Sequence, residues 1–350
     1  MTSAPPATPS HLAFVESPVQ LLNVLEWACH AGRPDLLVVV LSPTDPMSRG
    51  QLRRMARLAR DEGYAVRWQE ARGGRGALPR ALRDLAPALL RAERVVVGDP
   101  FSRYVQLLLT LFGPRAVTVV DDGTATMEFA AQLTRGERLV RWHRRGRARD
   151  ARELALAPVT ALARRRLAPG RGRAVEIFTA LPVEAPEGAT VTANRFAWTR
   201  ARFGPPRLTW GADLVGTSLV ETGVVDPDRY TGAVAALAAA HGATRYFAHR
   251  RESVEKLHRI AVETGLEIVR PDLPLELIAR RGPIGRTVLS FPSTVVHTLP
   301  AALAGTGVTI TVCRIAPEWL RETASPRAQG FLAGVAESAR SAHGLSLTAA

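Results

Sequence analysis

Short runs of β-branched and other apolar residues alternate along the chain with longer stretches whose apolar residues recur every three or four positions. A short apolar run is typical of a buried strand, and the three- and four-residue spacing is typical of an amphipathic helix. Strands and helices that alternate in this way form right-handed crossover units on parallel sheets. The pattern therefore predicts an α/β protein built on doubly wound sheets.

The predicted elements form two sets. In the first half the expected strands are Leu12–Val15, Leu36–Leu41, Ala65–Trp68, Arg94–Val97 and Ala116–Val120, with helices from Pro18, over Arg49–Glu62 and over Leu78–Arg91. In the second half the expected strands are Val175–Thr179, Asp213–Val215, Thr244–Phe247, Glu267–Val269, Thr287–Ser290 and Val308–Val312, with helices over Asp226–His241, Glu252–Thr264 and Thr294–Ala304. A chain of 350 residues, 46% of them hydrophobic, can bury two domain cores.

An arginine-rich stretch, Arg135–Arg173, separates the two sets. We expect residues 11–135 to form the first domain, 136–174 a helical or linker segment, and 175–345 the second domain. The beginning, 1–10, is rich in Pro, Ala, Ser and Thr, which predicts a disordered lead-in rather than a signal peptide.

The net charge of +14 suggests polyanionic partners, but the basic residues are very uneven in type. Of the 46 basic residues 45 are arginine, and Lys256 is the only lysine, a bias typical of a GC-rich genome. The density within Arg135–Arg173 predicts either a solvated helix and linker or a surface for an anionic glycan or an anionic membrane face. Nucleic acid is not expected as a partner, because Trp142 is the only aromatic residue within the stretch.

The sequence carries no apolar run near the ~20 residues that span a bilayer. The two cysteines, Cys29 and Cys313, lie in apolar contexts and predict buried core thiols. We therefore expect a cytoplasmic protein, with the arginine-rich stretch as the segment that would contact the inner face of the cell membrane.

The expected strand over Ala116–Val120 delivers Asp121 and Asp122 at its carboxyl end, and Gly123 then turns the backbone. Ligands bind at this edge of open α/β sheets. Two adjacent carboxylates cannot both be desolvated cheaply, so one of them suits a general base with a raised pKa. The same residues also suit a cap of the next helix or a magnesium site, and the spacing leaves all three open.

Two later strand ends have the composition of a phosphate site. His249, Arg250 and Arg251 follow the expected strand Thr244–Phe247 and precede a helix, where charge and the helix dipole favour an anion. His249 would act as an acid toward the departing phosphate, or else it is a turn residue with the arginines in water.

Ser293 and Thr294 stand between the strand over Thr287–Ser290 and the next helix. Their hydroxyls would either cap that helix or bind a phosphate. The chain has no Gly-rich dinucleotide fingerprint, Walker loop, G-x-S-x-G elbow or zinc-type Cys/His spacing, which counts against those enzyme classes.

Taken in order, these strand ends resemble the D/E-D/E-G, His-Pro and Ser-Ser/Thr motifs of bacterial sialyltransferases. The opening FVESPVQLLNVLEW resembles the SP-x-Q-x-x-N-x-x-E start of the polysialyltransferase-related group, and VGTSLVETGVVDPDRY resembles its stretch that opens the nucleotide-binding domain. The resemblance implies the glycosyltransferase-B architecture, two Rossmann-like domains with a cleft between them.

The resemblance also implies roles for individual residues. Asp121 is the base on the acceptor hydroxyl, Asp122 is its structural or alternate partner, and His249 is the acid or a hydrogen-bond donor to the CMP phosphate. The implied CMP-sugar-binding residues are Gly216, His249, Arg250, Glu276, Ser293 and Thr294. The implied acceptor-side residues are Ser17, Pro18, Gln20 and Gly123.

The implied reaction is a single inverting displacement that needs no cofactor and no metal, with a CMP-sugar donor and a glycan acceptor as substrates. Arg250 stands where the family has proline, so the donor is sialic acid or another CMP-activated 2-keto sugar acid. Two alternatives remain: a glycosyltransferase-B enzyme that uses another nucleotide sugar, and a non-catalytic protein that binds an acidic glycan.

Overall fold

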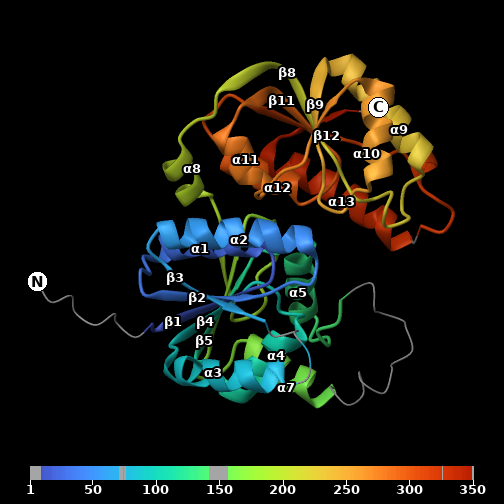
Figure 1. Ribbon diagram of the computed structural model, residues 1–350. Coiled ribbons are helices and arrows are strands. Elements are labelled where there is room, and N and C mark those ends of the chain that lie inside the picture. Colours follow the sequence, from blue (N-terminus) through green and yellow to red (C-terminus); the bar gives the residue numbers. More distant parts are fainter. Residues whose placement is uncertain (1–8, 71–73, 75, 142–156, 325, 349–350) are drawn as a thin grey trace, which may run out of the picture. The chain divides into compact units, whose positions relative to one another are not determined.

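The computed structural model describes residues 9–70, 74, 76–141, 157–324 and 326–348. The chain divides into two compact units, Met1–Asn194 and Arg195–Ala350, called the first and second unit below. Each unit is a parallel sheet with helices on its faces (Figure 1).

The sheet of the first unit has the strand order β3-β2-β1-β4-β5-β6-β7, and all neighbouring strands are parallel. Its strands are β1 (His11–Val15), β2 (Leu36–Leu41), β3 (Ala65–Gln69), β4 (Arg94–Val97), β5 (Ala116–Val120), β6 (Ala174–Thr179) and β7 (Thr190–Ala193). The order reverses at β1, so the crevice between the ends of β1 and β4 is the topological switch point of this unit.

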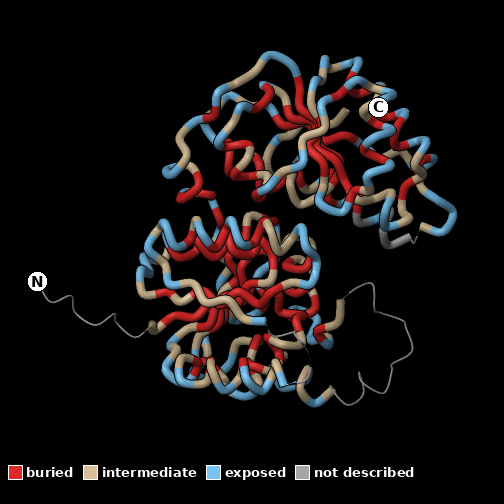
Figure 2. Tube along the Cα trace, viewed as in Figure 1, coloured by how far each residue is buried: buried red, intermediate tan, exposed pale blue. Residues whose placement is uncertain are grey.

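Helices cover both faces of this sheet. They are α1 (Pro18–Ala31), α2 (Pro46–Asp61), α3 (Ala77–Arg91), α4 (Arg103–Phe112), α5 (Thr124–Thr134) and α7 (Ala157–Leu167). In Figure 1, α1 and α2 lie on one face, and α3, α4 and α7 lie on the other. Because both faces are covered, strands such as β1 and β2 are apolar runs, and the central strands are buried along most of their length (Figure 2).

Local sequence signals set where several of these helices begin. The Ser17 and Asp45 side chains accept hydrogen bonds from the Gln20 and Ser48 N–H groups, and each is followed by proline at the first helical position. Ser102 caps α4 in the same way. A side-chain oxygen at the cap satisfies a backbone N–H that has no partner within the helix, and proline at the first helical position removes another such donor.

The second unit repeats the plan with the strand order β10-β9-β8-β11-β12-β13, again parallel throughout. Its strands are β8 (Leu208–Val215), β9 (Ala243–Phe247), β10 (Glu267–Val269), β11 (Ile284–Ser290), β12 (Thr309–Cys313) and β13 (Ser346–Thr348). Its helices are α8 (Ala197–Phe203), α9 (Pro227–His241), α10 (Val254–Thr264), α11 (Leu275–Arg281), α12 (Val295–Ala302), α13 (Pro326–His343) and the 3₁₀ helix η2 (Pro317–Trp319). The switch point is β8, which lies between β9 and β11.

The predicted α/β class and the two Rossmann-like domains are confirmed, but the boundary between the domains differs from the predicted one. We expected the second domain to begin at Val175. Instead β6 pairs with β5, with Val175 opposite Val117, and β7 pairs with β6. The first unit ends at Asn194, whose side-chain amide donates a 2.9 Å hydrogen bond to Asn23 Oδ1 on α1.

Other expectations meet the structure in part. Cys313 is buried as predicted, whereas Cys29 is exposed on α1. Most of the expected lead-in, and residues 142–156 of the arginine-rich stretch, lie outside the described residues. Within the described part of the chain, none of the helices has both the length and the apolar composition that crossing a membrane requires.

The boundary can be tested with two truncated chains. A fragment of residues 1–194 is expected to unfold cooperatively, because it keeps the whole first sheet. A fragment of residues 1–174 loses β6 and β7, exposes the edge of β5 and deprives Asp121 of its partners Thr179 and Ala180, so we expect it to aggregate. Circular dichroism melting and size-exclusion chromatography measure both; equal behaviour of the two fragments would contradict the boundary.

Candidate functional site

Acidic residues follow three neighbouring strands of the first sheet. Glu16 comes directly after β1, Asp99 follows β4, and Asp121 and Asp122 follow β5. Because the strands are parallel and adjacent, their carboxyl ends lie along one edge at the switch point, where open α/β sheets bind ligands.

The Asp121 carboxylate is almost completely buried, with the residue 2% exposed. Its Oδ2 accepts hydrogen bonds from Thr179 Oγ1 at 2.8 Å and Ala180 N at 3.2 Å. Its Oδ1 accepts from Gly123 N at 3.2 Å. Burial raises the pKa of Asp121 to about 6, although the hydrogen bonds from Thr179, Ala180 and Gly123 act in the opposite direction.

Asp122 has a different environment. Its side chain is 18% exposed, and its Oδ2 lies 3.6 Å from Arg141 Nη2. The same Arg141 nitrogen donates a 2.7 Å hydrogen bond to Asp99 Oδ2, so one guanidinium group links two of the acidic strand ends. Neither aspartate occupies the cap position of α5, which is Gly123, and the helix has no side-chain cap hydrogen bond; Asp121 Oδ1 accepts only the N–H of Gly123 itself. The helix-cap interpretation of this motif is therefore wrong.

Of the four residues expected on the acceptor side, three on or beside α1 are buried, and Gly123 is partly exposed. Gln20 is 3% exposed and its Oε1 accepts the Glu16 N–H at 2.6 Å, while a Cβ at Gly98, after β4, would lie 2.5 Å from that oxygen. Ser17 is 8% exposed and caps α1, and Pro18 is buried beside it. The start of α1, with Ser17, Pro18 and Gln20, thus packs beneath the carboxyl-end edge of the sheet as a structural support.

Asn23, one helical turn beyond Gln20, has the same supporting role. Its side-chain amide donates to the Asp121 backbone oxygen at 2.9 Å, and its Oδ1 accepts from Asn194. The S-P-x-Q-x-x-N spacing brings these polar side chains to the face of α1 that packs on the sheet. We did not include Asn23 among the candidate residues, although the spacing contained it.

In the second unit, three predicted donor-binding segments meet at neighbouring strand ends. His249 follows β9, Gly216 follows β8 and Ser293 follows β11, and these strands are adjacent in the order β9-β8-β11. Residues far apart in the sequence therefore share one edge of the sheet at its switch point.

His249 is held in a turn before α10. Its Nδ1 accepts the Arg251 N–H at 3.2 Å, so the neutral ring carries its proton on Nε2. Burial and, to a smaller extent, the neighbouring positive charges of Arg250, Arg251 and Lys256 together lower the pKa of His249 to about 4. At neutral pH the ring is therefore a hydrogen-bond donor and not a source of a full proton. Arg250 is exposed in the same turn.

The Ser293–Thr294 turn leads into α12. Thr294 occupies the cap position, and no side chain caps the helix. Within the described residues, neither hydroxyl makes a hydrogen bond to the protein. The cap interpretation of Ser293 is therefore wrong.

Glu276 lies beside this turn, because its Oε1 accepts the Thr298 hydroxyl of α12 at 2.5 Å. Glu276 is 5% exposed, and burial raises the pKa of its carboxyl group.

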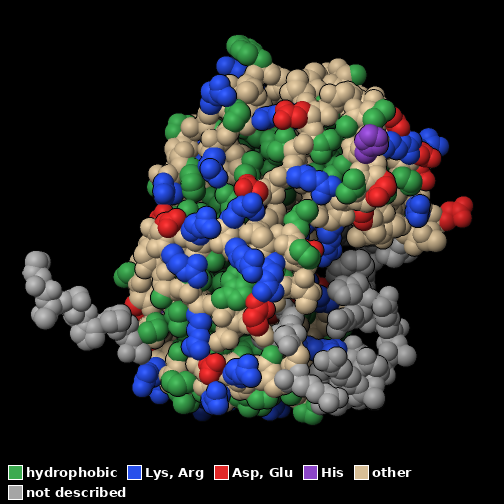
Figure 3. Space-filling view, in the orientation of Figure 1, with side chains coloured by type: hydrophobic (Ala, Val, Ile, Leu, Met, Phe, Trp, Pro, Cys, Tyr) green, Lys and Arg blue, Asp and Glu red, His purple; other side chains and the backbone are tan. Residues whose placement is uncertain are grey.

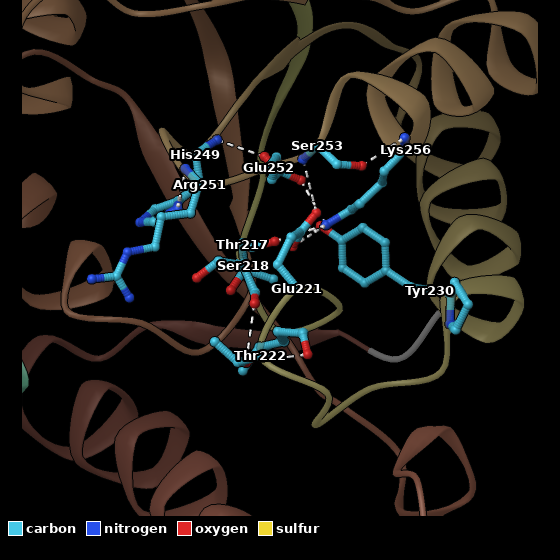
Figure 4. A network of polar contacts seen from close by, with 12 residues as sticks. Thr217, Ser218, Glu221, Thr222, Tyr230, His249, Arg251, Glu252, Ser253 and Lys256 are labelled. Carbon is cyan, nitrogen blue, oxygen red and sulfur yellow. Dashed lines mark hydrogen bonds and ion pairs between the residues drawn. The ribbon is translucent and has the colours of Figure 1, made fainter. Parts of the chain in front are cut away.

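Lys256 belongs to a buried polar network beside His249, drawn in Figure 4, and Gly216 packs against this network. A Cβ at Gly216 would lie 2.4 Å from both Glu252 Oε2 and the Tyr246 hydroxyl, so only glycine fits. Lys256 donates to the Thr217 backbone oxygen at 2.8 Å. Sequence reasoning missed Lys256 as a site residue; its being the only lysine of the chain was the available signal.

Several arginines of the Arg135–Arg173 stretch have structural partners. Besides Arg141, the Arg166 guanidinium packs against Gly113 after α4, and Arg173 donates to the Ala168 backbone oxygen at the end of α7. Over the face in Figure 3, basic side chains are scattered with acidic ones among them rather than gathered in one patch. Contact with an anionic glycan or membrane stays a prediction. Among the described residues, no cluster of three or more His, Cys, Asp or Glu side chains is arranged to hold a metal ion.

Comparisons with known proteins find similarity in structure only. No protein-family model and no curated protein sequence matches the chain. The α/β-galactoside α-2,3-sialyltransferase of Photobacterium phosphoreum is similar over 96% of this chain and 98% of that one, with 9% identity and a TM-score of 0.52.

Two further solved structures are similar at lower TM-scores. A Photobacterium 2,6-sialyltransferase, in a ternary complex with CMP and lactose, has 11% identity over 96% of this chain and 78% of that one, with a TM-score of 0.46. A putative UDP-N-acetylglucosamine 2-epimerase of Listeria monocytogenes has 12% identity over 96% and 92%, with a TM-score of 0.47.

The similarity to the Photobacterium phosphoreum enzyme shows the fold. The predicted glycosyltransferase-B fold is confirmed in that both Rossmann-like units are present. The cleft between them stays a prediction.

Gly216→Ala tests the close packing at the end of β8. The added methyl group meets the Glu252 and Tyr246 oxygens, so we expect the free energy of unfolding to fall by about 1–3 kcal/mol. Gly232→Ala on α9 is the control, because a Cβ there meets nothing within 4 Å, and it should be neutral or stabilising by up to about 1 kcal/mol. Urea unfolding of both variants measures the difference; equal stabilities would contradict this packing.

Proposed function

We propose that this protein is an inverting glycosyltransferase that moves sialic acid, or a related 2-keto sugar acid, from a CMP-sugar to a glycan hydroxyl. The observation that carries the proposal is the meeting of His249, Gly216 and Ser293 at the adjacent ends of β9, β8 and β11. These are the segments whose sequences resemble the donor-binding motifs of bacterial sialyltransferases. The fold shared with such an enzyme over nearly the whole chain is consistent with it.

The second unit supplies donors for the departing CMP phosphate. The Nε2–H of neutral His249 and the Ser293 and Thr294 hydroxyls donate hydrogen bonds to the phosphate oxygens, where negative charge grows as the bond to the sugar breaks. Glu276 would accept hydrogen bonds from the ribose hydroxyls. Because the pKa of His249 is about 4, we assign it the role of hydrogen-bond donor rather than that of a general acid.

The first unit supplies the base. Asp121 takes the proton of the acceptor hydroxyl while the hydroxyl oxygen attacks the anomeric carbon and CMP departs from the opposite side. We place the acceptor at Oδ1, which accepts only the long 3.2 Å hydrogen bond from Gly123 N among those described above, since Oδ2 accepts hydrogen bonds from both Thr179 and Ala180. The carboxylate is 2% exposed, so acceptor binding requires the residues that cover it to move aside. Arg141 would keep Asp122 oriented beside it.

The experiment that tests the function is a release assay with CMP-sialic acid beside UDP- and GDP-sugars, with and without a chelator. We expect CMP release from CMP-sialic acid that a glycan acceptor accelerates and a chelator leaves unchanged. Faster turnover of a UDP- or GDP-sugar would contradict the donor, and loss of activity with the chelator would contradict the metal-independent mechanism.

The pH profile tests the base. Asp121 must be ionised to accept a proton, so kcat/KM is expected to fall as the pH drops below about 6, the pKa of this carboxyl group.

Asp121→Asn should lower kcat by about 10²–10⁴-fold and still bind CMP, because the CMP site lies in the other unit. Asp122→Asn is the matched control with a smaller loss. A larger loss in Asp122→Asn would instead assign the base to Asp122.

The hydroxyl pair tests the phosphate site. Ser293→Ala and Thr294→Ala should each weaken CMP binding about 10- to 150-fold, since a hydrogen bond to a charged group is worth roughly 1.5–3 kcal/mol. Because neither hydroxyl caps α12, the free energy of unfolding should change by less than about 0.5 kcal/mol. Calorimetric titration with CMP and urea unfolding measure the two quantities. Lost stability with unchanged CMP affinity would indicate a structural role.

A further inference from the structure

The most deeply buried ion pair of the His249 region joins two residues one helical turn apart at the start of α10. Lys256 Nζ lies 2.7 Å from Glu252 Oε1, with the side chains 7% and 0% exposed. Figure 4 shows the lysine side chain reaching toward the turn that follows β8. Since arginine occupies every other basic position, this lysine is exceptional in the chain.

Each member of the pair also holds a segment that follows a strand. Lys256 Nζ donates to the Thr217 backbone oxygen at 2.8 Å and lies 3.4 Å from Glu221 Oε2, both in the turn after β8. Glu252 Oε2 accepts the His249 N–H at 2.5 Å, in the turn after β9. Glu221 Oε1 also accepts the Ser253 N–H at 3.1 Å. The pair therefore joins the two turns.

Two tyrosines enclose the pair. The Tyr246 hydroxyl donates to Glu252 Oε1 at 2.6 Å and is 2.7 Å from the Tyr230 hydroxyl. Lys256 Nζ lies 4.1 Å from the centre of the Tyr230 ring. Gly216 closes the remaining space, because a Cβ there would touch Glu252 and Tyr246. The two charges thus have several fixed partners and little room to shift.

An ion pair of this kind is a poor source of stability. Removing two charges from water costs more than their attraction returns in many proteins, and apolar residues of the same size often fold more stably. Burial raises the pKa of the Glu252 carboxyl group, because removal from water disfavours its charged form. The ion pair does, however, make directed hydrogen bonds to two backbone segments at once, which an apolar pair cannot do.

We propose that Lys256 is a positioning residue for donor binding, which holds the His249–Glu252 turn against the Gly216–Glu221 turn so that both present one surface to the nucleotide phosphate. This inference rests on the proposed function of the same site. A lysine suits the task better than an arginine, because its compact ammonium group directs three donors to three different oxygens, whereas the planar guanidinium group is built for paired acceptors.

The test compares Lys256→Met with Arg259→Met, which removes an exposed cation of the same helix that pairs with Glu263. We expect Lys256→Met to weaken CMP binding by about tenfold or more, and to raise KM for CMP-sialic acid more than it lowers kcat, as in the loss of a directed hydrogen-bond network. Arg259→Met should leave both unchanged. Lys256→Arg should recover little of the CMP affinity, because the planar guanidinium group cannot donate to the same three oxygens.

A double variant separates positioning from stability. Lys256→Met alone leaves the Glu252 carboxylate buried without its cation, so its stability is expected to fall. Glu252→Gln with Lys256→Met removes both charges and should recover much of that stability without recovering CMP affinity. Recovery of both would show that Lys256 only stabilises the fold, and would overturn the proposal.

The imidazole of His249 gives a readout that needs no turnover. NMR titration should find its pKa near 4 in the wild type and closer to the ordinary value in Lys256→Met, because the loosened turn admits water and a positive charge is gone. An unchanged pKa and unchanged CMP affinity in a folded Lys256→Met would overturn the proposal. If the wild type binds no CMP, the proposed function fails, whereas an unchanged His249 pKa in a folded Lys256→Met would by itself overturn the positioning role of Lys256.

Discussion

Polar groups buried at the carboxyl ends of parallel strands must find partners within the protein, and the organisation of both units depends on this constraint. In the first unit Asp121 is surrounded by Thr179, Ala180 and Gly123, and its backbone oxygen is held by Asn23. A buried acceptor without a partner costs roughly 1–3 kcal/mol. The strand ends are therefore fixed by hydrogen bonds as much as by the apolar core beneath them.

The second unit meets the same constraint with charge. Glu252 and Lys256 satisfy each other and, through their remaining donors and acceptors, two backbone segments. The effect is similar to that in the first unit although the residues differ: the turn after β9, which carries the candidate residue His249, is held by buried hydrogen-bond partners. In both units the supporting residues make hydrogen bonds to the turns whose side chains we expect to contact substrates.

Much of the fold could be predicted from the sequence because the strands are buried on both faces. Apolar runs such as Leu36–Leu41 and Ala116–Val120 have the predicted bounds, since covered parallel strands leave no polar face to confuse the pattern. The domain boundary could not be predicted in the same way. The arginine-rich stretch has the composition of a linker, so the sequence suggests a boundary there. However, β6 belongs to the first sheet because it pairs with β5, and composition does not encode this pairing.

The candidate site was predictable in position more than in detail. Asp121, His249 and Ser293 lie at strand ends as expected, because a strand followed by a polar turn is a local signal. Burial is not local. The sequence alone does not tell whether Ser17 and Gln20 are exposed to a ligand or buried as supporting residues. The packing of α1 on the sheet buries both. The neutral state of His249 likewise depends on its neighbours in space.

The single lysine has a practical consequence for observing the protein at work. Reagents that acylate amines react with the neutral amine of a lysine that has left its partners and lost a proton, and in this chain each of the other Lys/Arg-type side chains is a guanidinium group. Lys256 is enclosed by Thr217, Glu221 and Glu252. The rate at which a label enters its side chain therefore reports how often this corner of the second unit opens, and mass spectrometry of the peptide that contains Lys256 reads that rate without any engineered probe.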